Sequence, residues 1–456
     1  MKTRHPFWLF AFILFNLNIS VHASKNQNIG IGEQFATLFF LSEDEKQSRI
    51  EHISANWEAS FTPMAIEVMS LARADLAQRL IALLQQKTGQ SIGYDTNDWF
   101  VWWWKQVPVQ SVEYADFKAS LYRQIDPKFD AYFSKDRESR VRMDEIRWGG
   151  VRQDGIPPLR QPKMINASEA SYLDDDNVVF GIEINGDARA YPKRILAWHE
   201  MFVDTIGGTD FVGVYCTLCG AVILYKTNHN GVQHHLGTSG FLYRSNKVMY
   251  DKNTQSLWNT TWGEPVVGPL VGKNIRLKRS YLVTTTWEEW KRRHPNTTVL
   301  SIDTKHQRDY SEGVAYKQYF ATDELMFSTS TPDHRLKNKD EILALTFPNI
   351  SQQSMAISAE FLAKKPVYKN SFDNFKFVIF TDASGANRVY ESKNIEFISY
   401  DQDITATDSS GKEWTLAEDK LVITDVRIGN ELARLPAHRA FWFGWFSAFP
   451  ETILIK

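Results

Sequence analysis

The chain contains two cysteines, Cys216 and Cys219, which are separated by two residues and followed by Gly220. Two thiolates at this spacing can bind one metal ion, or they can interconvert between a dithiol and a disulfide. Residues 212–215 and 221–225 are rich in Val, Ile, Leu and Tyr, which predicts a tight turn between two strands. A thioredoxin-type dithiol would instead begin a helix. The pattern therefore favours a metal-binding knuckle, in which Gly220 supplies the positive φ of the turn.

A histidine shortly before the cysteines is the first candidate for a further ligand. Positions 195, 198 and 202 are apolar at helical spacing, and His199 lies on the same predicted face. The predicted helix leads directly into the strand that carries Cys216, so His199 is either a ligand or proton carrier, or a buried core residue. Glu200 is a supporting candidate, because a carboxylate that folds back onto the imidazole fixes its tautomer.

Two residues farther along the chain are candidates for the remaining ligand. Met249 lies in a predicted strand, where its thioether would suit Cu(I) beside thiolates, although core packing explains the same residue. His438 lies between Pro436 and the aromatic run 441–449. The sequence therefore predicts a copper or zinc ion held by the two cysteines and His199, together with Met249 or His438. It assigns no catalytic residue.

The first residues of the chain have the pattern of a targeting segment. Lys2 and Arg4 form a basic head, an apolar run covers 7–17, and positions 21–23 have the small-x-small pattern of a cleavage site. We therefore expect residues 1–23 to be a signal peptide and the protein to be periplasmic or extracellular. An uncleaved N-terminal membrane anchor is the alternative. No later stretch of the sequence is long and apolar enough for a membrane span, so we expect no integral membrane segment after cleavage.

Charge and cysteine content exclude several classes of protein. Removal of residues 1–23 would take away Lys2 and Arg4 and change the formal net charge from −2 to −4. This negative charge argues against nucleic acid and against an anionic membrane surface as partners. Two cysteines in 456 residues also exclude a disulfide scaffold, so the core must be held together by burial.

Two regions of different character predict an α+β protein. In residues 30–150, apolar residues recur at helical spacing over 66–84 and a helix rich in tryptophan follows. This pattern resembles a unit of a HEAT-like repeat, so we expect a small all-α N-terminal domain of the kind that docks a protein partner. Glycines and prolines at 148–158 mark a boundary. Residues 155–456 are mainly β in pattern and contain the Cys-x-x-Cys knuckle.

A series of motifs accompanies the cysteines over residues 155–450. They include Ala188-Arg189-Ala190-Tyr191-Pro192, Ile195-Leu196-x-Trp198-His199-Glu200, Tyr215-Cys216-x-Leu218-Cys219-Gly220, Ser239-Gly240-x-Leu242-Tyr243, Val248-Met249-Tyr250-Asp251, Arg308-Asp309-Tyr310 and Ala440-Phe441-Trp442-Phe443-Gly444-Trp445. These motifs resemble a bacterial family named only as domain of unknown function 3179. The resemblance implies no activity.

The chain departs from the pattern of that family at two places. Thr217 stands between the cysteines, where the family usually has proline. Residues 311–314 replace a Gly-Arg-Asp-Pro-Tyr type of segment after Tyr310. If this loop shapes a pocket in the family, the pocket is altered here.

Three hypotheses for the function follow from these observations. The first is a copper or zinc site used for metal binding or redox chemistry. The second is a metal-free pair of cysteines that exchanges thiols and disulfides with partners in an oxidising compartment. The third is an interaction protein that docks through its helical domain, with the cysteines as a structural clip. Whether the chain is an enzyme stays open, since no phosphate loop, nucleotide fingerprint or serine-hydrolase pattern is recognised in it.

Overall fold

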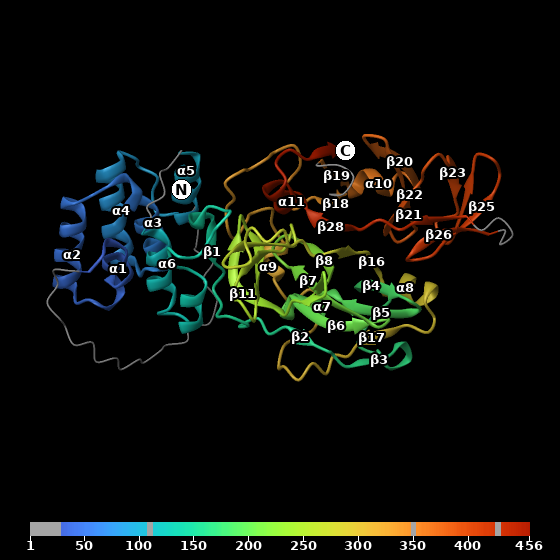
Figure 1. Cartoon of the computed structure of the whole chain (residues 1–456), viewed down its shortest axis with the longest axis horizontal. Helices are drawn as coiled ribbons and strands as arrows, with labels where there is room; N and C mark the ends of the chain where they lie inside the picture. The colour runs from blue at the N-terminus through green and yellow to red at the C-terminus, as the bar shows by residue number, and fades with distance from the viewer. Residues whose placement is uncertain (1–28, 107–112, 348–352, 425–429) are drawn as a thin grey trace.

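The computed structural model describes residues 29–106, 113–347, 353–424 and 430–456 (Figure 1). The predicted signal peptide, residues 1–23, lies outside the described residues. In Figure 1 the helices of the N-terminal part lie at one end of the molecule, sheets form the middle, and the strands between β20 and β26 lie at the other end. Within the described part of the chain, no helix has the length and apolar character needed to cross a membrane.

The N-terminal part is helical, as predicted. Ser42 begins a helix through a capping box with Glu45, and Gly89, with a φ of 71°, ends another in the left-handed conformation that favours glycine. The helices are α1 (Ile31–Ala36), α2 (Glu43–Ala55), α3 (Thr62–Leu71), α4 (Ala74–Thr88), α5 (Thr96–Lys105) and α6 (Tyr114–Tyr122), with short 3₁₀ turns at Leu38–Phe40, Ala59–Phe61, Pro127–Ala131 and Met143–Glu145.

The helices share a core with the first sheet. Phe241 lies in that sheet, and its ring centroid is 4.9 Å from that of Tyr122 and 4.8 Å from that of Phe129. The fully buried Lys118 forms an ion pair with Glu67 and donates a hydrogen bond of 2.7 Å to the Ile146 carbonyl. Because Ile146 begins a strand of the first sheet, this lysine ties the two parts together.

Three five-stranded sheets follow, with short connections and tight turns. The first has the order β1 (Ile146–Trp148), β11 (Leu236–Tyr243), β12 (Asn246–Asp251), β13 (Leu257–Asn259), β14 (Glu264–Val267). The second has the order β15 (Arg279–Ser280), β8 (Ala221–Lys226), β7 (Thr209–Cys216), β6 (Met201–Ile206), β2 (Leu159–Arg160). The third has the order β16 (Val283–Thr286), β4 (Val178–Ile184), β5 (Asp187–Pro192), β17 (Thr298–Leu300), β3 (Met164–Asn166).

Short helices and hairpins connect these strands. They are η5 (Ala167–Glu169), α7 (Lys193–His199), α8 (Trp287–Arg293), α9 (Lys317–Phe320) and the hairpin of β9 (Asn228–His229) with β10 (Val232–Gln233). The predicted helix around His199 exists but is shorter than its apolar pattern suggested. It ends because Glu200 adopts a left-handed conformation, with a φ of 54°, so that Phe202 belongs to β6 instead of the helix.

The C-terminal part continues the β-rich architecture. A four-stranded sheet has the order β28 (Ala437–Phe441), β18 (Glu341–Thr346), β19 (Ser354–Ser358), β29 (Ile453–Ile455), and α10 (Ala359–Ala363) and α11 (Trp442–Ala448) adjoin it. A three-stranded sheet contains β20 (Val367–Phe372), β21 (Phe375–Thr381) and β22 (Asn387–Glu391). A last sheet contains β23 (Phe397–Tyr400), β24 (Thr405–Asp408), β25 (Glu413–Leu416), β26 (Lys420–Ile423) and β27 (Glu431–Ala433). The structure thus confirms the predicted class of N-terminal helices followed by a large β-rich region.

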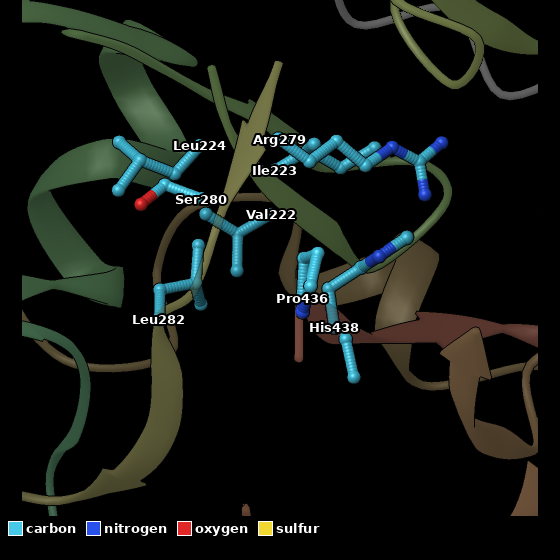
Figure 2. A pocket seen from close by; sticks show the side chains of 9 residues that line it. Val222, Ile223, Leu224, Arg279, Ser280, Leu282, Pro436 and His438 are labelled. Carbon is cyan, nitrogen blue, oxygen red and sulfur yellow. The ribbon is translucent and has the colours of Figure 1, made fainter. Parts of the chain in front are cut away.

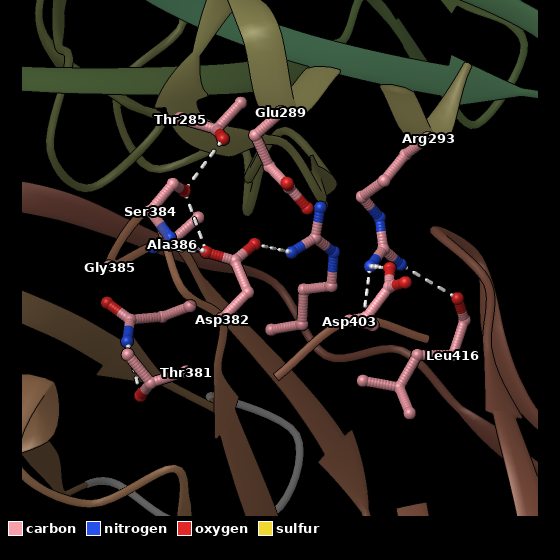
Figure 3. A network of polar contacts seen from close by, with 12 residues as sticks. Thr285, Glu289, Arg293, Thr381, Asp382, Ser384, Gly385, Ala386, Asp403 and Leu416 are labelled. Carbon is pink, nitrogen blue, oxygen red and sulfur yellow. Dashed lines mark hydrogen bonds and ion pairs between the residues drawn. The ribbon is translucent and has the colours of Figure 1, made fainter. Parts of the chain in front are cut away.

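A buried polar network holds the C-terminal strands against α8 (Figure 3). Arg293 of α8 donates hydrogen bonds to the carbonyls of Asp403 and Leu416. Beside it, the Thr285 and Ser384 hydroxyls are 3.1 Å apart. These contacts satisfy buried polar groups across the junction, and they join α8 and β16 to the connection between β21 and β22 and to the last sheet.

Candidate functional site

The Cys216–Cys219 pair lies in a tight turn between β7 and β8, as the sequence predicts. Residues of the two strands pair up to Cys216 opposite Ala221, and the two cysteines form a disulfide. Gly220 has a φ of 59°, and a Cβ at this position would lie 2.9 Å from the Phe441 ring. Glycine is therefore required both by the backbone conformation and by the close approach of β28. Both cysteines are buried, with 4% and 1% of their surface exposed.

Hydrogen bonds from three other segments hold the turn. They run from Thr217 Oγ1 to Glu200 Oε1 (2.6 Å), from Tyr319 Oη to the Leu218 carbonyl (2.8 Å), and from the Phe441 N–H to the Cys219 carbonyl (2.8 Å). The fourth neighbour is Gly444 of α11, where a Cβ would lie only 2.6 Å from the Cys219 Cβ. The position of the turn is thus fixed by tertiary contacts that do not involve the sulfur atoms.

Glu200 is the polar centre of this region. Its carboxylate is buried, accepts the hydrogen bond from Thr217, and forms an ion pair with the buried Lys247 of β12. The Tyr316 hydroxyl donates a further hydrogen bond of 3.1 Å to the same carboxylate. Burial and then the Glu200 charge raise the pKa of Tyr316 well above its ordinary value, so this phenol stays protonated and remains a donor.

Residues 310–328, which we call the covering segment, connect the turn with the N-terminal helices. The segment includes Tyr316 and the tyrosine that donates to the turn. Aromatic residues of the segment pack in the same cluster as the two cysteines. At its end, Ser328 Oγ donates a hydrogen bond of 3.3 Å to the carbonyl of Asn97 in α5. One segment therefore touches both the disulfide turn and the helical part.

His199 is buried, but its hydrogen bonds lead away from the cysteines. Its Nδ1 is 2.8 Å from the Pro157 carbonyl and its Nε2 is 2.5 Å from the Tyr310 hydroxyl. A carbonyl only accepts, so Nδ1 carries the proton and Nε2 accepts from Tyr310. Desolvation lowers the pKa of His199 to about 4, which keeps the ring neutral near pH 7. Pro157, and not the predicted Glu200, therefore sets the tautomer.

Met249 and His438 occupy two further places. Met249 is fully buried in β12, between Thr238 and Trp258 of the neighbouring strands. His438 lies in β28 and lines a cavity of about 10 Å³ beside Arg279 (Figure 2). Burial, with a smaller contribution from Arg279, lowers the pKa of His438 well below its usual value. Among the described residues, its Nε2 has no hydrogen-bond partner.

The predicted metal ligands are thus not gathered in the described structure. The cysteines are bonded to each other and present no thiolates, and both nitrogens of His199 are engaged. In the described ranges, no group of three or more His, Cys, Asp or Glu side chains is placed to hold one ion. With the disulfide formed, the described residues do not provide the predicted set of ligands for copper or zinc. The metal site therefore stays a prediction.

The sequence patterns do not single out Lys247, Tyr316 and Tyr319 as neighbours of the cysteines. A signal existed for Lys247, because a lysine inside an apolar strand pattern is buried only when it has a partner. The tyrosines gave a weaker signal, since they follow the stretch 311–314 that departs from the family pattern. Nothing in the local pattern indicates that they return to the turn.

The comparisons with known proteins agree with the motifs. A family model described as Protein of unknown function (DUF3179) matches residues 153–452, which include the turn, Glu200, Lys247 and the covering segment. No curated protein and no solved structure matches the chain.

Proposed function

The chain belongs to the DUF3179 family of proteins of unknown function, and we propose that its Cys216–Cys219 pair is a thiol–disulfide exchange centre. The observation that carries the proposal is the disulfide in a turn fixed by hydrogen bonds that do not depend on the S–S bond. Such a turn stays folded when the bond opens. The reduced sulfurs then stay close together and can be oxidised again.

A purely structural clip is a weaker explanation for this disulfide. The two cysteines are only three positions apart. By the loop-entropy relation, a loop this short contributes only about 2 kcal/mol, compared with about 3 kcal/mol for a loop of 15 residues. The hydrogen bonds around the turn, at about 1 kcal/mol each, supply a similar stabilisation without the sulfurs.

The proposed reaction exchanges electrons with a dithiol, which is either a protein or a small molecule. A thiolate of the dithiol attacks one sulfur of the pair, forms a mixed disulfide and releases the other sulfur as a thiolate, which takes up a proton. The second thiol of the partner then attacks the mixed disulfide. The partner leaves as a disulfide and the protein as a dithiol, so two electrons and two protons are transferred. The reverse reaction oxidises a partner dithiol.

Access to the buried sulfurs requires a movement of the covering segment. Tyr319 is held to the turn by a single hydrogen bond to a carbonyl, and the preceding residues 311–314 are exposed. Local opening of this one segment costs less than global unfolding, since the sheets keep their own contacts. Exchange that proceeds through local opening is slow with bulky partners and faster with small ones.

Titration of the full-length protein with dithiothreitol tests the proposal. The fraction of reduced Cys216 and Cys219 is counted by alkylation and mass spectrometry, while near-UV circular dichroism reports the fold. We expect reversible two-electron reduction with the circular dichroism signal unchanged, and no alkylation in the Cys216→Ser/Cys219→Ser variant. Reduction only together with unfolding would overturn the proposal and indicate a clip.

Export would place this centre in an oxidising compartment, and we include it in the proposal because of the pattern of residues 1–23. N-terminal sequencing of the mature protein tests it. The HEAT-like character of the helices and their docking to a protein partner also stay predictions, as does the copper or zinc site, which would require the reduced pair.

A further inference from the structure

We propose that the Glu200–Lys247 ion pair supplies and removes the proton of the Cys216–Cys219 sulfurs, acting through the Thr217 hydroxyl. This inference rests on the proposed exchange function and adds a role for buried charges that the exchange chemistry alone does not require. Glu200 acts through Thr217, so it is a positioning residue and the sulfurs remain the reacting groups.

The geometry attaches the carboxylate to the turn twice. The Glu200 side chain accepts from the hydroxyl of Thr217, the residue that directly follows Cys216. The Glu200 backbone carbonyl accepts a hydrogen bond of 2.9 Å from the Tyr215 N–H, directly before Cys216. Glu200 and Cys216 therefore move as one unit, and the proton-carrying groups keep their place when the disulfide opens.

Stability alone does not explain this arrangement. Lys247 and Glu200 are both more than nine-tenths buried, and the desolvation of two charges offsets much of their attraction. Glu200 also has a φ of 54°, which costs a non-glycine residue additional free energy. Strain and buried charge at one residue beside a reactive group are typical of functional sites.

A sulfur that leaves inside the protein favours a proton carrier at this place. A thiolate released inside the protein is strongly disfavoured unless it is protonated or paired. Lys247 passes a proton to the Glu200 carboxylate. The carboxylic acid group then rotates and donates this proton to the Thr217 hydroxyl, with the hydrogen bond between them reversed, and the hydroxyl passes its own proton to the leaving sulfur. Lys247 then takes up a proton from solvent. This proton replaces the one that the attacking thiol released to solvent when it became a thiolate. Oxidation of the pair runs through the same steps in reverse.

The other ionisable groups around the pair do not replace it. The Tyr316 phenol donates to Glu200, and burial and the Glu200 charge raise its pKa further. Burial also raises the pKa of Tyr215, with smaller contributions from Glu341, Glu200 and Glu312. The described hydrogen bonds of His199 lead to Pro157 and Tyr310, so it takes no part.

The test compares rates of reduction by dithiothreitol between pH 6 and pH 9 in the full-length wild type, Glu200→Gln, Lys247→Met and the double variant. Each single variant leaves one buried charge without its partner and can lose the fold for that reason. The double variant removes both charges, so we expect it to stay folded. Each rate is divided by the thiolate concentration of the reductant. In the wild type the proton is delivered inside the protein, so this normalised rate does not follow the proton concentration of the solvent. In the double variant the leaving sulfur must take its proton from solvent, so the normalised rate falls as the pH rises and is about tenfold or more lower at pH 7.

A matched control is Glu67→Gln/Lys118→Met, which removes a buried ion pair in the helical part and away from the turn. We expect it to lower stability and to keep the wild-type pH profile. If the wild type and the Glu200→Gln/Lys247→Met variant have the same normalised profile, the inference is wrong, although the exchange function stands. If the folded wild type is not reduced at all, the proposed function itself is wrong.

Discussion

The Tyr319 hydroxyl donates a hydrogen bond of 2.8 Å to the carbonyl oxygen of Leu218, inside the turn that the disulfide closes. The covering segment is thus fastened directly to the loop between the two cysteines. Its tyrosine ring packs in the same cluster as both sulfur-bearing residues. One side chain therefore both bonds to the turn and packs beside the disulfide.

Replacement of Tyr319 by Phe removes this hydrogen bond and retains the ring. A neutral hydrogen bond contributes about 1 kcal/mol, so we expect the rate of reduction by dithiothreitol to rise about fivefold. The measurement is the rate of cysteine alkylation after mixing with reductant. Tyr368→Phe is the control, because its hydroxyl accepts from Asn370, far along the chain from the turn. Equal rates in Tyr319→Phe and the wild type would show that the segment does not limit access.

Replacement of Gly220 by Ala is expected to destabilise the protein by about 2–3 kcal/mol. The new methyl group would meet the Phe441 ring. The alanine would also have to adopt the left-handed backbone conformation of Gly220, which is unfavourable for a residue with a side chain. Gly186→Ala is a matched control, since Gly186 has a φ of 84° but nothing within 4 Å of a Cβ. The control should cost only about 1 kcal/mol. Urea unfolding of both variants checks the difference, and equal losses would contradict the close packing of β28 on the turn.

His199 predicts a dependence of stability on pH. Desolvation lowers its pKa to about 4, below the value of about 6.5 in an unfolded chain. The unfolded state thus binds more protons between these values, so the stabilisation is complete above pH 6.5 and is lost as the pH falls towards 4. Its size is on the order of 2 kcal/mol, after allowance for solvent screening.

The measurement for His199 is the free energy of unfolding in urea at pH 7, 5.5 and 4, for the wild type and His199→Gln. The variant should lose less stability between pH 7 and pH 4 than the wild type does. His438 is also buried with a lowered pKa, but it is present in both proteins and its effect cancels in the comparison. Parallel pH curves would contradict a buried neutral His199.

Replacement of Arg388 by Met is expected to destabilise the protein by about 3–5 kcal/mol. Arg388 is buried and forms ion pairs with Asp382 (2.7 Å) and Glu418 (2.8 Å), and its loss would remove the cation that faces the fully buried Asp382 carboxylate. Lys364→Met removes a solvent-exposed ion pair with Glu360 and should leave the stability almost unchanged. Thermal unfolding compares the two variants. A small effect of Arg388→Met would show that its two ion pairs are not needed to hold the C-terminal strands.

Local signals in the sequence predicted the immediate surroundings of the cysteines. Short runs rich in Val, Ile, Leu and Tyr indicated β7 and β8, and the glycine after the second cysteine indicated the positive φ that the turn adopts. The helix before β6 was also predicted, but its end was not. The pattern of apolar residues continues to Phe202, whereas the left-handed conformation of Glu200 redirects the chain. Apolar spacing alone does not distinguish a helix from a helix followed by a strand.

The partners of the turn were beyond a local pattern, because they are distant in sequence. Lys247 is 47 positions from Glu200, and Tyr316 is 116 positions away. The sequence therefore offers His and Met residues as ligands only because of their side-chain chemistry. Two of them, His199 and Met249, make their contacts with residues other than those of the turn. Glu200 does lie at the turn, but its side chain bonds to Thr217 and Lys247 and not to the predicted partner, the His199 imidazole.

The covering segment ends on α5, where Ser328 bonds to Asn97, and this has a kinetic consequence. Opening of the segment to admit a reductant and any event that displaces α5 act on the same stretch of chain. A ligand of the helices that favours the displaced segment would therefore raise the population of the open state, and with it the rate at which the cysteine pair is reduced.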